Sequence, residues 1–462
     1  SVLVVEALDR IGGRLHTAMY SGIKVDIGGQ WYVIKVLFFF YNICNRVGPT
    51  QQRIHKLLNE LNMETIPQHY SGNSVLLMKK KSSPVSHAYK GIIPPLNIVQ
   101  LIDLQRVLSD VEAKAATVDL EKPWETANAK LWDSMTVKTY MDQMFWGEIP
   151  KETFKIMVQT VNSAEPEELS FLFFLLYIKS AGSLDALIES QGGAQDAKIK
   201  GGAQQVPLKL AEKIGKEKYL LNTAVAHIEQ EVSVTSDEQK AELAAYQLDF
   251  SQTLVRITST DGRVFYCKKV IMAMAPNMSK SIKCTPPMPG LREHLCQRMP
   301  MGHVLKTNVL FKTTWWREKG YSGFFGNIID NDTNFPTCAG FDFTESPGIV
   351  GFIIGKMAKT VGEWTKEQRL NALLNQYSVM FQTPIEQVKA QVLDYAEKDW
   401  SQEEYIRGAY TGFCVPGAIT QCGKMLREPI GNIHFAGTET ALHWTGYMDG
   451  GIESGIRSAA EV

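Results

Sequence analysis

The segment Gly431–Gly455, GNIHFAGTETALHWTGYMDGGIESG, carries more structural information than any other part of the chain. It predicts a buried strand (IHFAG), a polar loop with aromatic residues, and a helix that opens at Gly450 and Gly451. The first N–H groups of such a helix are free, and the helix dipole favours negative charge there. The segment therefore indicates a site for an anion or an electron-rich ring, although an ordinary strand–loop–helix has the same pattern.

The start of the chain, SVLVVEALDRIGGRLHT, shows a second pattern of this kind. An apolar strand ends in Glu6, and an acidic residue at that position suits a ribose hydroxyl. Gly12 and Gly13 would let the backbone approach a ligand closely, and Arg14 would suit a phosphate. Strand–acid–turn patterns are common, so this segment alone is a weak signal.

Taken together, these two segments and the motifs DIGGQW, VGPTQ, GGAQ, KGGAQQV, MGHVLK and EKDW resemble the flavin-containing amine oxidase family. The similarity is greatest to the monoamine oxidase branch and runs across nearly the whole chain. It implies an α/β (α+β) fold in which an FAD-binding, Rossmann-like domain is interleaved with a mixed-sheet and helical substrate domain. The cofactor domain is expected at residues 1–70, 200–285 and 400–462, and the substrate domain at 71–199 and 286–399.

Composition places the chain among ordinary soluble globular proteins, with 462 residues, 44% hydrophobic residues and a net charge of −1. No basic stripe is present, which argues against a nucleic-acid partner. The 7 cysteines show no C-x-x-C spacing, which favours free thiols in a reducing compartment over disulfides or a zinc site. No apolar run reaches the roughly 18 residues that a membrane-spanning helix needs.

Both ends of the sequence depart from the family pattern. The family's cofactor domain opens with a strand and a G-x-G-x-x-G turn, and this sequence is expected to start at the second strand, with the first strand truncated. Membrane-bound monoamine oxidases carry an anchoring helix beyond the position of Val462. An intracellular protein is expected, at the mitochondrial outer membrane if such an anchor exists and in the cytoplasm otherwise. Its assembly is open, and a homodimer is one alternative.

A further departure is the segment Tyr32–Arg46, YVIKVLFFFYNICNR, between Trp31 and Val47. The family runs from GGQW directly into VGPTQ. Exposed in a loop, these apolar residues would promote aggregation. We interpret the segment as translated intron sequence or a gene-model error, with a lineage-specific strand as the alternative.

Local patterns predict several elements. Helices are expected at Gln52–Met63 and over most of 98–142, where Thr136 would cap the helix that follows it, and Pro84–Pro95 is expected to be a crossing segment. Strands are expected at Val304–Phe311 and on both sides of Asp261-Gly262, a hairpin signal.

Three residues would carry the chemistry that the resemblance implies. Tyr410 and Tyr447 match the aromatic pair that flanks the amine in monoamine oxidases, where facing π-systems attract a cation. Lys306 matches a lysine beneath the flavin that holds a water against the reactive nitrogen, and burial there would require pairing or a lowered pKa. Core packing of the tyrosines and a solvent-facing lysine are the ordinary alternatives.

Further residues match the family's FAD contacts. Glu6 would bind the adenosine ribose, Val225 would lie against the adenine, and Trp400 would pack beside Lys306 and the flavin. Backbone N–H groups near Met448 would stabilise the reduced ring. The remaining positions would follow the pyrophosphate, the ribityl chain and the ring: Arg14, Gly28, Gly29, Gly437 and Thr438.

The resemblance also implies a substrate cavity and a mode of cofactor attachment. The cavity would be lined by four residues: Gln195, Ile188, Thr160 and Val161. Vertebrate monoamine oxidases tether the flavin through a cysteine where this chain has Ala409, and Cys414 lies too far along the sequence to replace it. FAD is therefore expected to bind non-covalently.

The resulting hypothesis is FAD-dependent oxidative deamination of a primary aryl- or alkylamine to an aldehyde, ammonia and hydrogen peroxide, with oxygen as the acceptor and no metal. Polyamine or L-amino-acid oxidation within the same family is one alternative, although no arginine can be assigned to a substrate carboxylate. An inactive truncated fragment or scaffold is the other.

Overall fold

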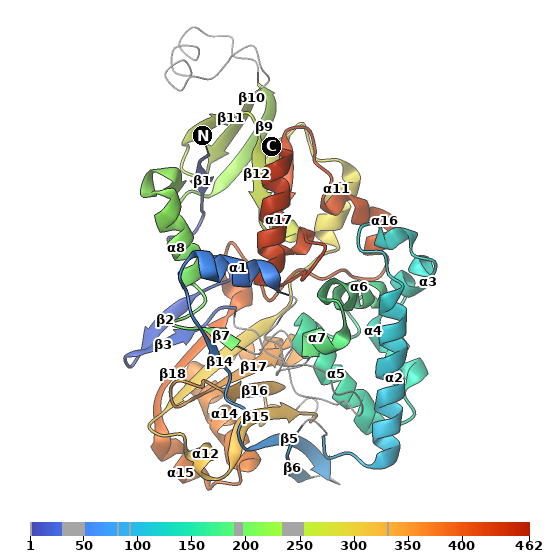
Figure 1. Ribbon diagram of the computed structural model, residues 1–462, viewed down its shortest axis with the longest axis vertical. Coiled ribbons are helices and arrows are strands. Elements are labelled where there is room, and N and C mark those ends of the chain that lie inside the picture. Colours follow the sequence, from blue (N-terminus) through green and yellow to red (C-terminus); the bar gives the residue numbers. More distant parts are fainter. Residues whose placement is uncertain are drawn as a thin grey trace.

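The computed structural model describes residues 2–29, 51–80, 83–91, 94–188, 197–232, 254–329 and 332–462. The interpretations of Tyr32–Arg46 and of Gln195 therefore fall outside the described residues. The architecture is mixed α/β, as the sequence predicts, with several separate sheets and a layer of helices (Figure 1).

A seven-stranded sheet forms the lower body in Figure 1. Its order is β18 (Val392–Asp399), β14 (Val304–Phe311), β17 (Gly348–Ile354), β16 (Ala339–Asp342), β15 (Tyr321–Asn327), β5 (Asn73–Lys80) and β6 (Ser83–Tyr89). The prediction of a strand at Val304–Phe311 is confirmed, and all of its residues are buried. The expected crossing segment at Pro84–Pro95 is wrong in its first half, which forms β6 at the sheet edge, where a proline is tolerated.

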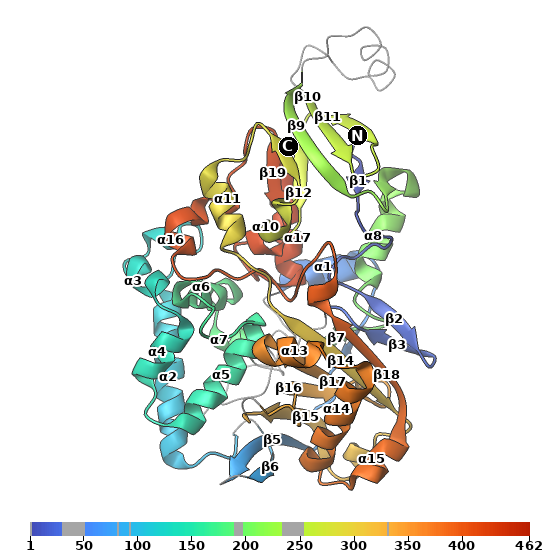
Figure 2. The ribbon, with the colours of Figure 1, turned by 180° about the vertical axis from the view of Figure 1, so that it is seen from behind.

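The two faces of this sheet pack against different partners. On one face, alternate side chains such as Val309 and Phe311 join a cluster with residues of α14 (Lys366–Met380). Figure 2 shows the α14 ribbon from behind. On the other face, Val304 and Leu310 pack with Trp400 and other residues near the N-terminal hairpin. Because side chains alternate along a strand, Lys306 shares the second face with Val304 and Leu310.

A helical layer lies beside the sheet in both views. It consists of α2 (Ile98–Ala116), α3 (Ala129–Ser134), α4 (Val137–Met144), α5 (Glu148–Asn162), α6 (Phe171–Ala181) and α7 (Leu184–Ile188). The predicted cap at Thr136 is confirmed, since its side chain accepts a hydrogen bond from the backbone N–H of Thr139. The α6 sequence, FLFFLLYIKSA, is almost wholly apolar and accordingly buried between neighbours.

The upper part of Figure 1 brings distant segments of the chain together, and both termini lie there. The strand β1 (Val4–Val5) pairs in parallel with β8 (Tyr219–Leu220), and β12 (Val270–Ala273) pairs in parallel with β19 (Ile433–Ala436). A four-stranded sheet contains β11 (Val264–Cys267), β10 (Leu254–Ser259), β9 (Val225–Val232) and β13 (Lys283–Thr285). The β10–β11 hairpin at Asp261-Gly262 is as predicted.

Shorter elements complete the fold. Two small antiparallel pairs are β2 (Thr17–Tyr20) with β3 (Ile23–Asp26), and β4 (Thr65–Pro67) with β7 (Ala197–Ile199). The other α-helices of the described residues are α1 (Gln52–Glu60), α8 (Gln205–Ile214), α10 (Pro276–Ser279), α11 (Gly290–Gln297), α12 (Trp315–Glu318), α13 (Gly355–Gly362), α15 (Ile385–Gln391), α16 (Ala418–Cys422) and α17 (Met448–Glu461). Within the described residues, no helix is both long and apolar enough to span a bilayer.

The cluster between the sheet and α14 should dominate local stability. Phe381 is fully buried among aromatic rings, including Trp315 at 5.6 Å between centroids. Phe381→Ala should lower the free energy of unfolding by about 3–5 kcal/mol, because it removes apolar burial and leaves a cavity. Leu131→Ala, at a side chain that is 58% exposed, should stay within about 0.5 kcal/mol. Chemical denaturation followed by tryptophan fluorescence measures both, and equal losses would contradict this assignment.

Candidate active site

Lys306 is buried against the segment that follows β3. Its Nζ donates hydrogen bonds to the carbonyl oxygens of Asp26 (2.6 Å) and Gly28 (2.9 Å). The indole Nε1 of Trp400 donates to the carbonyl oxygen between them, that of Ile27, at 3.0 Å. Lys306 is only 2% exposed, so it is buried as the family resemblance implies and does not face solvent as in the ordinary alternative. Three successive carbonyls are thus held by two elements of the seven-stranded sheet region.

The ammonium group of Lys306 is destabilised by its surroundings. Burial lowers the pKa of Lys306 from 10.5 to about 7, a shift that the Asp26 carboxylate opposes and Lys198 reinforces. Near neutral pH a substantial fraction of this lysine is therefore uncharged. A neutral amine can accept as well as donate a hydrogen bond, which a surface lysine at this pH does not do.

Tyr410 and Tyr447 come from separate segments and reach the same region. The backbone N–H of Tyr410 donates to Ser163 Oγ at 2.8 Å, and its ring meets Phe352 edge-on at 6.0 Å between centroids. Tyr447, immediately before α17, packs against Tyr177 at 6.2 Å between centroids. Burial raises the pKa of Tyr410, and the nearby Cys338 thiol and Tyr447 phenol raise it further. The two phenols therefore lie within electrostatic range of one another.

The residues predicted to contact FAD come from several segments of the chain. The amides of Gly28 and Gly29 donate to the carbonyls of His16 (2.9 Å) and Arg14 (2.8 Å), which joins the two glycine-containing turns. Glu6 accepts a hydrogen bond from the amide of Leu8 at 2.9 Å, and burial raises the pKa of Glu6.

The C-terminal segment supplies the other predicted contacts. Thr438 donates its hydroxyl to the Tyr447 carbonyl at 2.8 Å, and the Gly437 amide donates to Ser454 Oγ at 3.1 Å. Met448 opens α17, which has no side-chain cap at its N-terminus. Val225, by contrast, starts β9 in the four-stranded sheet.

These surroundings fit a flavin dinucleotide. A Cβ added at Gly13 would meet no atom within 4 Å, so there is open space beside the glycine turn. The uncapped start of α17 presents backbone donors, which suit an anionic or electron-rich group. The roles assigned to individual residues remain predictions.

The predicted cavity residues are only partly described. Thr160 and Val161 are buried near the end of α5, and Ile188 ends α7. Two residues that contact Tyr410 and Tyr447 were not predicted from the sequence. They are Ser163, which caps α5 in a left-handed conformation (φ 52°), and Tyr177. The hydroxyl of Tyr177 in the otherwise apolar run FLFFLLYI was a usable signal, whereas nothing local marks Ser163.

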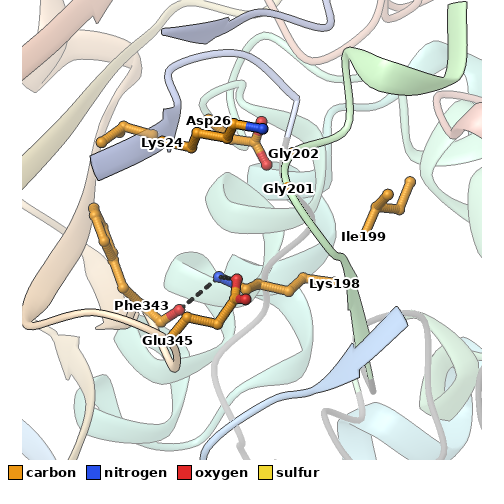
Figure 3. A pocket seen from close by; sticks show the side chains of 9 residues that line it. Lys24, Asp26, Lys198, Ile199, Gly201, Gly202, Phe343 and Glu345 are labelled. Atoms are coloured by element: carbon orange, nitrogen blue, oxygen red, sulfur yellow. Dashed lines mark hydrogen bonds and ion pairs between the residues drawn. The ribbon is translucent and has the colours of Figure 1, made fainter. Parts of the chain in front are cut away.

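A small polar pocket lies next to the Lys306 site (Figure 3). It is lined by Asp26, Lys24, Gly202, Lys198, Glu345 and their neighbours. The Lys198 ammonium donates to the Phe343 carbonyl and pairs with Glu345, both at 2.8 Å. The lining includes neither Tyr410 nor Tyr447, so this pocket adjoins the candidate active site but is not the predicted amine-binding site.

The fold and this arrangement define a flavin-dependent oxidoreductase of mixed α/β architecture. A family model described as flavin containing amine oxidoreductase matches residues 1–462, and the chain belongs to that family. It is an enzyme of amine oxidation, and its cofactor is a flavin.

Known proteins resemble the chain over its full length. It is 33% identical to amine oxidase [flavin-containing] B of Sus scrofa and 32% identical to that of Homo sapiens, in each case over 100% of this chain and 81% of the relative. Among solved structures, cyclohexylamine oxidase from Brevibacterium oxydans has a TM-score of 0.84 at 28% identity. Wild-type putrescine oxidase bound to putrescine has a TM-score of 0.85 at 25% identity. Each match covers 100% of this chain and 93% of the other.

The depressed pKa of Lys306 should appear as a pH-dependent stability. Its pKa is about 7 in the folded protein and near 10.5 when unfolded, so unfolding takes up a proton between these values. The contribution of Lys306 to the free energy of unfolding should therefore rise with pH from about 7 to 10.5. Lys306→Met should flatten the rise, as measured by urea denaturation at several pH values. Lys312→Met, at an exposed lysine directly after β14, is the control, and parallel curves for wild type and Lys306→Met would contradict the burial.

Proposed function

We propose that the chain oxidises a primary aryl- or alkylamine to an aldehyde, with release of ammonia and hydrogen peroxide and with FAD as cofactor. The observation that carries the proposal is that Lys306 and Tyr410 both lie against the Phe352 ring, at 5.9 and 6.0 Å from its centroid, and that Tyr447 is near enough to Tyr410 to raise its pKa. Bound FAD would accept the hydride equivalent from the carbon beside nitrogen and pass the electrons to oxygen. The protein would supply position, electrostatics and exclusion of water.

Each of the three side chains would have a separate task. The phenol rings of Tyr410 and Tyr447 would attract and orient the amine nitrogen through their π-systems. Tyr447 is buried and Tyr410 is half-buried, so the amine would lose much of its water between them. Lys306 would position a water near the flavin, and its pKa of about 7 would let it either donate or accept a proton at neutral pH.

The remaining assignments concern FAD. Glu6 would bind the ribose, Val225 the adenine, and Arg14 with Gly28 and Gly29 the pyrophosphate and ring. The start of α17 at Met448, together with Gly437, Thr438 and Trp400, would enclose the rest. The substrate side would be completed by four residues: Thr160, Val161, Ile188 and Gln195.

We further propose that FAD binds without a covalent bond, because Ala409 offers no thiol. The peptide bond from Ala409 to Tyr410 is cis, and Ala409 is 6% exposed. Acid precipitation of the purified holoprotein should leave the yellow flavin in the supernatant and a colourless pellet. Ala409→Ser, which is similar in size and also lacks a thiol, should behave identically. A yellow pellet that survives washing would overturn the proposal.

The tyrosine pair should control amine oxidation. Tyr447→Ala or Tyr410→Ala in FAD-loaded protein should lower kcat/KM for tyramine or phenylethylamine at least about tenfold, the equivalent of about 1.4 kcal/mol of lost transition-state stabilisation. Peroxide release in a coupled peroxidase assay measures this. Tyr405→Ala, at a tyrosine that is 38% exposed, should remain within about twofold of wild type. Wild-type protein that releases no peroxide from either amine would count against the proposal.

A second candidate is oxidation of a di- or polyamine, since putrescine oxidase is among the similar structures. The cofactor arrangement would be the same, so only the substrate separates the two. Peroxide release from putrescine, spermine and L-leucine, compared with phenylethylamine, decides between them.

A further inference from the structure

Glu439 forms a buried ion pair with Arg14. The residue belongs to the 3-10 turn Thr438–Thr440, and none of its side-chain surface is exposed. Its two carboxylate oxygens accept from the two terminal nitrogens of Arg14, at 2.6 and 3.1 Å. This bidentate geometry is the stronger form of an arginine–carboxylate contact.

The same carboxylate also reaches the segment that follows Tyr410. It accepts hydrogen bonds from the Thr411 hydroxyl and the Gly412 amide, both at 3.1 Å. Arg14, in turn, donates to the carbonyl oxygen of Tyr410 at 2.8 Å. One ion pair therefore joins the glycine turn after β1, the Tyr410 segment and the loop that leads to Tyr447.

The charge state of Glu439 is secured by these contacts. Burial by itself would raise the pKa of Glu439, but the Arg14 guanidinium and the backbone amides outweigh burial and hold the pKa below its ordinary value. A buried carboxylate that has lost its partner would be strongly unfavourable, so the pair should form or break as a unit.

We propose that Glu439 is a positioning residue that couples the cofactor-side turn at Gly12–Arg14 to the amine-side Tyr410. The proposal rests on the function proposed above for these two segments. Because Glu439 binds both segments, a shift in the position of Arg14 is coupled to a shift in the position of Tyr410. Weakening the pair should then reduce the affinity for FAD and for the amine together, although Glu439 itself carries out no chemistry.

A second ion pair in the chain provides a matched control. Asp342 is fully buried and binds the Arg317 guanidinium, and it also accepts from the Trp316 indole and the Thr344 amide. The exposed fractions of the two arginine side chains are similar, 25% for Arg14 and 27% for Arg317. The described contacts of Asp342 include neither Arg14 nor Tyr410.

The test compares Glu439→Gln with Asp342→Asn. Each variant keeps the shape and most acceptor capacity of the side chain but leaves an arginine without its counter-charge. Both apoproteins should unfold at lower temperature than wild type. Only Glu439→Gln should also raise the Kd for FAD, measured by flavin fluorescence titration of apoprotein, and the KM for phenylethylamine, each at least about tenfold. Asp342→Asn should leave both constants within about twofold.

Two further variants keep the proposal testable if Glu439→Gln does not fold. Thr411→Val removes one hydrogen bond on the tyrosine side and leaves the ion pair intact, and it should still raise the Kd for FAD about two- to threefold. The double variant Arg14→Gln/Glu439→Gln should have a Kd for FAD no higher than that of the single variant with the higher Kd, because the two side chains act as one unit.

Equal effects of Glu439→Gln and Asp342→Asn on the Kd for FAD would mean that the pair is only structural, and the proposal would fail. An unchanged Kd for Thr411→Val would also overturn it. If wild-type protein binds FAD but oxidises no amine, the proposed function fails, while the FAD titrations still decide whether Glu439 couples the two segments.

Discussion

The arrangement of the site depends on the burial of one lysine against two peptide carbonyls. Lys306 lies in a strand whose residues are all buried, and removing its ammonium from water is costly unless it is paired. The Asp26 and Gly28 carbonyls provide partners, and Trp400 fixes the carbonyl between them. The segment after β3 is thereby locked to the seven-stranded sheet. Since the Gly28 and Gly29 amides also bind the turn at Arg14, the lysine positions both glycine turns.

The second constraint is that segments far apart in sequence must meet. Parallel pairing of β12 with β19 brings residue 270 beside residue 433, and Asp449 in α17 accepts a hydrogen bond from the amide of Ile54 in α1 at 2.9 Å. Such long-range contacts make the site sensitive to its scaffold. A flavin held between the two ends of the chain would contact elements that local sequence alone does not hold together.

Sequence patterns correctly predicted those elements that depend on neighbouring residues in the chain. The cap at Thr136, the hairpin at Asp261-Gly262 and the strand at Val304–Phe311 follow from residue preferences and periodicity, and all are confirmed. The mixed α/β fold, the family and amine oxidation followed from motifs spread along the chain, and the comparisons bear them out. The domain boundaries and the individual site residues are still predictions.

What could not be predicted depends on tertiary contacts. The motif match led us to expect a buried Lys306, but the sequence does not show that the carbonyls of Asp26 and Gly28 are its partners. Pro84 suggested a break in regular structure. It lies in the edge strand β6, however, where a residue without a backbone N–H is tolerated. Glu439 and Ser163 carry no local signal, because each acquires its role from a residue more than two hundred positions away.

The placement of charge around the tyrosines follows from these contacts. An amine approaches most readily as a cation, and two basic residues, Arg14 and Lys306, lie in the same region. Left fully charged, they would repel it, because Coulomb interactions are strong where water is excluded. Glu439 neutralises Arg14, and burial brings the pKa of Lys306 to about 7. In the proposed reaction, Arg14 and Lys306 would therefore add little net positive charge near the two phenol rings, and the π-faces of these rings would attract the amine against less repulsion.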